Sequence, residues 1–68
     1  MILAIGKIKT YSNDTRTPVK FNYDIITGIT AAIDNNGNVL ADFTCPDETH
    51  ALKHWRETKH VSIDQVCA

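Results

Sequence analysis

A strict alternation of apolar and polar side chains from Val19 to Ile25 is the feature that most constrains the fold of this chain. Successive side chains of a β-strand point to opposite faces, so this period of two predicts a strand with one buried and one polar face. A chain of 68 residues has room for a single hydrophobic core. The alternation therefore predicts one small sheet that is covered on one side.

Two neighbouring segments also have strand character. The chain opens with a short apolar run followed by lysines, which predicts a strand over residues 2–11 rather than a signal peptide. Residues 12–18 are polar and end in proline, so we expect a loop there. After residue 25, Gly28 interrupts an apolar pattern that continues to residue 33; we expect a bulge in one bent strand, with a tight turn as the alternative.

Residues 35–38, with the sequence Asn-Asn-Gly-Asn, predict a hairpin turn. A two-residue loop would place a charged residue opposite an apolar one. We therefore expect a three-residue loop that ends in a left-handed Gly37. The pairs that follow from this loop are Ile33 with Val39, Ala31 with Ala41 and Ile29 with Phe43.

An amphipathic helix is expected next. Thr44 and Asp47 have the spacing of a capping box, and Pro46 suits the first helical turn. The helix should end near residue 59 or 60. Its apolar stripe of Ala51, Leu52 and Trp55 should rest on the sheet against Phe21, Tyr23, Ile33 and Phe43.

The fold class that follows is α+β in one small domain, residues 1–68. We expect an antiparallel meander of three to four strands with one amphipathic helix packed on one face. Residues 61–64 alternate again and predict a short C-terminal strand, with a helical turn at 62–65 as the alternative.

Charge is unevenly distributed along the chain. The net charge is only −1, yet residues 21–48 hold five carboxylates and no lysine or arginine. Such a set can steer a protein toward a basic groove on a larger partner; alternatively, it keeps a small sheet soluble and blocks edge pairing. The partner-binding candidates are Asp24, Asp34, Asp42, Asp47 and Glu48.

Nucleic acid is the alternative partner. Lys53, Arg56 and Lys59 are expected on the outward side of the helix, and three aromatic residues of the sheet could stack on bases: Tyr11, Phe21 and Tyr23. The isoelectric point of about 6.2 disfavours this partner, because counterion release requires a strongly positive surface.

A zinc-stabilised domain is a further alternative. Its candidate ligands are Cys45, His50, His54 and Cys67, but their spacing matches no paired zinc knuckle. We therefore expect no metal and no other cofactor. Cys45 is also placed near a helix N-terminus, where thiols become reactive, although no oriented base accompanies it and a small buried apolar role is favoured.

The sequence contains no phosphate-binding loop, no nucleophile elbow and no CxxC pair. So short a chain also lacks packed walls for a catalytic cleft, and we expect no enzymatic activity. We expect a cytoplasmic binding protein with free thiols and no membrane span. Its size and lack of catalytic chemistry are typical of phage and mobile-element accessory proteins, which regulate or inhibit a host protein or nucleoprotein complex by docking on it.

Overall fold

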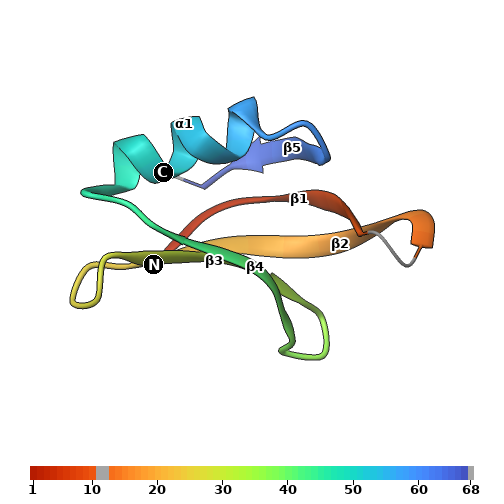
Figure 1. Ribbon diagram of the computed structural model, residues 1–68, viewed down its shortest axis with the longest axis horizontal. Coiled ribbons are helices and arrows are strands. Elements are labelled where there is room, and N and C mark those ends of the chain that lie inside the picture. The colour runs from red at the N-terminus through yellow and green to blue at the C-terminus, as the bar shows by residue number, and fades with distance from the viewer. Residues whose placement is uncertain (11–12, 68) are drawn as a thin grey trace.

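The computed structural model describes residues 1–10 and 13–67, without side-chain detail at positions 10, 13 and 14. Five antiparallel strands form one sheet in the order β4-β3-β2-β1-β5, and one helix, α1, lies over one face of it (Figure 1). The elements are β1 (Ile2–Thr10), β2 (Asn13–Asp24), β3 (Ile29–Asp34), β4 (Val39–Thr44), α1 (Glu48–Glu57) and β5 (Val61–Val66). The predicted α+β class is confirmed, and the C-terminal segment is a strand that pairs with β1.

The core lies between α1 and the sheet. Trp55 is fully buried, and its ring centroid lies 4.9 Å from that of Phe21 and 4.8 Å from that of Phe43. Its indole Nε1 donates a hydrogen bond of 2.9 Å to the hydroxyl of Thr30, which in turn donates to the carbonyl oxygen of Asn22. The only polar group of the indole is therefore satisfied although the ring is buried.

The core position predicted for Ile33 is wrong. Thr30 and Ala32 face α1, while Ile29, Ala31 and Ile33 point to the other face of the sheet, where Ile33 lies beside the exposed Lys20. The prediction assumed that the apolar phase of β2 continues unbroken past Gly28. It does not, because the chain reverses there.

Residues 25–28 form the tight turn of a β2–β3 hairpin, so the expected bulge in one bent strand is wrong and the alternative is correct. Gly28 has φ +74°, a left-handed conformation that glycine adopts without a Cβ clash, and its amide donates to the carbonyl oxygen of Asp24 at 2.8 Å. This turn resets which residues of β3 face the core.

The β3–β4 hairpin has the predicted three-residue loop. Gly37 has φ +83°, and Ile33 pairs with Val39 as expected. Beyond this pair the register shifts by one residue, so that Ala32 pairs with Ala41 and Thr30 with Phe43, unlike the predicted pairs. The shift is a β-bulge, and it places Phe43 on the helix-facing side beneath Trp55.

Two predicted boundaries are also wrong. The expected polar loop over residues 12–18 is largely strand, since β2 begins at Asn13. Pro18 is tolerated in this strand because β3 pairs with β2 only from Val19 onward, which leaves one side of Pro18 open.

The helix begins after Asp47, whose carboxylate accepts the amide of His50 at 2.8 Å, and it ends at Glu57. Asp47 itself is thus the N-cap, not the third residue of a capping box.

Candidate functional site

One end of the molecule gathers apolar side chains that nothing covers. The molecule measures 32 × 19 × 18 Å, and the β2–β3 turn, the N-terminus and the start of α1 lie toward the same end of its long axis (Figure 1). In the turn Ile25 is 74% and Ile26 is 91% exposed, and Met1 nearby is 59% exposed. We call this surface the docking end; its apolar residues are Met1, Ile25 and Ile26.

The turn that presents the two isoleucines is closed by several hydrogen bonds. The Asp24 carboxylate accepts the amide of Ile26 at 2.9 Å and that of Thr27 at 3.5 Å. The carbonyl oxygen of Gly28 accepts the amide of Cys45 at 2.8 Å, which fastens the turn to the segment before α1. Met1 pairs with Tyr23 through backbone hydrogen bonds of 2.8 Å and 2.9 Å. The apolar side chains are therefore presented by an ordered backbone.

Three of the five predicted acids surround this end. Burial of the Tyr23 hydroxyl raises its pKa, and the negative charges of Asp47, Glu48 and Asp24 raise it further. The hydroxyl donates to the carbonyl oxygen of Cys45 at 3.0 Å. All three carboxylates act on one buried hydroxyl and are therefore close to one another. The N-terminal ammonium, which donates to the carbonyl oxygen of Tyr23, offsets part of their charge at this end.

The other two predicted acids lie elsewhere, so the five do not form one surface. The Asp34 carboxylate accepts the amides of Asn36 and Asn38, both at 2.9 Å, and thereby closes the β3–β4 loop. These bonds lower the pKa of Asp34, the amide of Asn38 most strongly. Asp42 pairs with Ala31 on the face of the sheet opposite α1. Asp34 thus has a structural role in its own turn.

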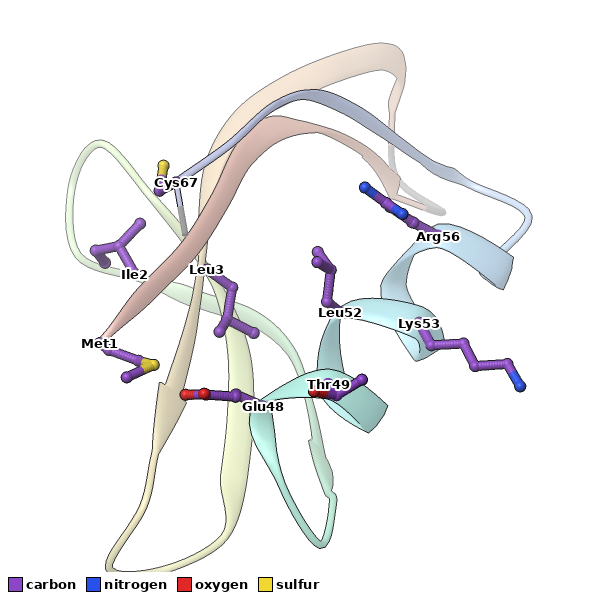
Figure 2. Close-up of a pocket in the computed structure, with 9 residues that line it drawn as sticks. All are labelled: Met1, Ile2, Leu3, Glu48, Thr49, Leu52, Lys53, Arg56 and Cys67. Carbon is purple, nitrogen blue, oxygen red and sulfur yellow. The ribbon is translucent and has the colours of Figure 1, made fainter.

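A groove opens between α1, the start of β1 and the end of β5 (Figure 2). Its volume is about 500 Å³, within the usual range of ligand pockets. Figure 2 shows Met1 and Glu48 at one end and Arg56 at the other, with Leu3 and Leu52 between them. The groove therefore begins at the docking end and continues its apolar surface along the helix. Its lining residues are Met1, Ile2, Leu3, Glu48, Thr49, Leu52, Lys53, Arg56 and Cys67.

Two of the three aromatic residues of the nucleic-acid alternative are buried. Phe21 is fully buried and Tyr23 nearly so, both beneath α1, and Tyr11 lies outside the described residues. Lys53, Arg56 and Lys59 are exposed, but Figure 2 shows the Lys53 and Arg56 side chains diverging, with Lys53 pointing away from the groove. The cations of the sheet lie on its far side, and among residues 1–10 and 13–67 no aromatic side chain accompanies them there.

The candidate zinc ligands are also separated. Cys45 is buried, Cys67 is exposed at the groove, and the ring of His54 packs on Phe43 with centroids 4.0 Å apart. The Nδ1 atom of His50 lies 2.8 Å from the carboxylate of its N-cap, Asp47. Among residues 1–10 and 13–67, no three histidine, cysteine or acidic side chains are grouped closely enough to hold a metal.

The helix cap predicts a pH effect. The backbone amide and the side chain of His50 both lower the pKa of Asp47 below its ordinary value of 3.8. The charged carboxylate therefore stabilises the fold above the unfolded pKa, and this contribution is lost as the pH falls through the lower folded pKa. We expect the melting temperature to decrease when the pH is lowered below about 4. Asp24 and Asp34, whose pKa values are also lowered, should contribute to the same decrease.

The matched variant is Asp47→Asn, because asparagine caps helices but does not titrate. Its melting temperature, followed by circular dichroism from about pH 6 down to about pH 2.5, should decline less steeply than that of the wild type. Parallel declines in the two proteins would show that the cap carboxylate does not contribute.

No helix within the described part of the chain is long and apolar enough to cross a membrane. The chain matches no protein-family model, no curated protein and no solved structure.

Proposed function

We propose that this chain is a small protein-binding module that docks on a larger protein through its docking end. The observation that supports this most is the pair Ile25 and Ile26, which are 74% and 91% exposed at the tip of a hydrogen-bonded turn. Contiguous apolar side chains that are exposed on a small domain are typical of a surface that a partner covers. Because the turn is already ordered, binding costs little conformational entropy.

The acids around the docking end define the partner's chemistry. Asp24, Asp47 and Glu48 favour an apolar pocket rimmed by lysine or arginine, and they disfavour the anionic surface of a membrane. Glu48 is the acid best placed to pair with such a rim, since Asp24 and Asp47 also accept backbone amides of their own turns. The groove beside Met1 extends the surface that a partner can fill.

The test is capture of the partner with and without the two isoleucines. Burying one isoleucine contributes about 1.5–3 kcal/mol, so Ile25→Ser/Ile26→Ser should weaken binding by about 100-fold or more, without lowering the melting temperature by more than a few degrees. Val39→Ser is the matched control. Val39 is also an exposed apolar residue, but it lies beside the β3–β4 loop and not in the β2–β3 turn.

A protein that is captured by the wild type and the control but not by the double variant, and that binds directly once purified, would support the proposal. Equal capture by the control and the double variant would contradict it. The electrostatic part predicts that Asp47→Asn/Glu48→Gln slows association and weakens its dependence on salt.

A further inference from the structure

The face of the sheet that α1 leaves uncovered carries exposed apolar side chains among its charged ones. On one row of this face Ile5, Lys20, Ile33 and Val39 are neighbours on four adjacent strands. Ile5 is 38%, Ile29 41% and Val39 55% exposed. We call this surface the open face; its defining residues are Ile5, Lys20, Ile29, Ile33, Val39 and Asp42.

The open face differs from the docking end in its charge. Lys20 on β2 and Asp42 on β4 flank β3, beside Ile33 and Ala31 respectively. One strand, β3, lies between them, so their strands are two inter-strand spacings, or about 10 Å, apart. Within the part of the chain that the structure describes, neither side chain forms a hydrogen bond or an ion pair. The face thus carries an unused cation, Lys20, between Ile5 and Ile33, and an unused anion, Asp42, on the other side of β3.

We infer that the open face binds a second copy of this chain. A two-fold dimer uses the same patch on both copies, so the patch must be complementary to itself. A two-fold axis that lies in the interface and crosses β3 between Ala31 and Ile33 brings Lys20 of each copy opposite Asp42 of the other. The apolar side chains of the open face are then buried between the two copies. The docking end cannot pair with itself in this way, because Asp47 and Glu48 would repel their copies. Asp24 lies at the edge of the open face beside Ile29, but its carboxylate accepts an amide of its own turn.

The size of the face sets the expected affinity. Four strands about 4.8 Å apart and three rows of side chains about 7 Å apart give a footprint of roughly 400 Å² per copy, before the relief of the side chains is added. Two copies give a total of roughly 800 Å², below the about 1,000 Å² of specific interfaces, so we expect a weak dimer with a micromolar Kd. The more distant lysines of β1 lie outside this footprint.

Sedimentation equilibrium at low salt, from about 1 µM to about 500 µM, measures this dimer directly. The wild type should change from 7.6 kDa to twice that mass over this range. Lys20→Glu and Asp42→Lys should each raise the Kd about tenfold or more, because each places like charges opposite one another. The double variant Lys20→Glu/Asp42→Lys restores opposite charges and should return to within about threefold of the wild type, as should an equimolar mixture of the two single variants.

Two controls separate this inference from the proposed function. Lys53→Glu, on α1, changes the same type of charge away from the open face, and Ile25→Ser/Ile26→Ser removes the docking end; neither should alter the dimer. Circular dichroism confirms that each variant is folded. A wild type that stays monomeric at about 500 µM would overturn the inference, as would single variants that dimerise normally or a double variant no better than either single one.

Discussion

Replacing Trp55 with alanine should leave most of the protein unfolded at 25 °C. Truncation of a buried tryptophan costs about 3–5 kcal/mol, and a domain this small is stabilised by about as much. Here the loss includes ring contacts with Phe21 and Phe43 at 4.9 Å and 4.8 Å and the hydrogen bond to Thr30. Far-UV circular dichroism and urea denaturation measure the effect.

Two variants make this result specific to the indole. Trp55→Phe keeps a ring in the core and should cost about 1–3 kcal/mol, so that the variant still shows a cooperative transition. His54→Ala changes the neighbouring exposed residue and loses its ring contacts with Phe43 and Trp55, which should cost about 0.5–1.5 kcal/mol. If His54→Ala were as destabilising as Trp55→Ala, the core described above would be incorrect.

Gly6→Ala should be the second most damaging substitution. Gly6 is buried in β1 between Val19 and Ile63, and a Cβ there would overlap the backbone carbonyl oxygen of Ser62. The Cε2 atom of Phe21 would lie 3.1 Å away on another side. Since a backbone atom cannot rotate aside, β5 would have to separate from β1, and the cost should reach or exceed the usual 1–3 kcal/mol of overpacking.

Gly37→Ala is the matched control for this effect. Gly37 has φ +83° but open space around its Cα, so an alanine there pays only the left-handed backbone strain of about 1–2 kcal/mol. Urea denaturation of both variants should show a larger loss for Gly6→Ala, together with faster amide hydrogen exchange in β5. Similar losses in the two variants would mean that β1 and β5 are less closely packed than described.

Much of the fold follows from local patterns. The alternation in β2 and the stripe of Ala51 and Trp55 on α1 identify the buried faces, because period and burial agree in both elements. The three-residue hairpin loop follows from matching apolar partners across the turn. The one-residue shift within β3–β4 does not follow, because it is set by the packing of Phe43 beneath the helix, which no local pattern records.

The candidate site depended on the one turn whose pattern was misleading. Ile25 and Ile26 continue the apolar run of β2 and therefore look buried, whereas the structure places them at an exposed tip. The sequence did hold a signal, since Asp24 precedes Gly28 by four residues, and an aspartate that accepts amides two and three residues ahead is a common way to close a turn. The acids near this tip were predicted as partner-binding residues from charge alone, but their grouping depends on the tertiary fold.

The central claim is that Ile26 touches a partner protein, and site-specific photocrosslinking tests it most directly. A photoreactive amino acid at position 26, in otherwise unaltered protein within its native cells, should crosslink to one defined protein that carries a basic-rimmed apolar pocket. The same amino acid at position 39 should not capture that protein. If position 26 captured nothing, or captured only what position 39 captures, the docking end would not be the binding surface.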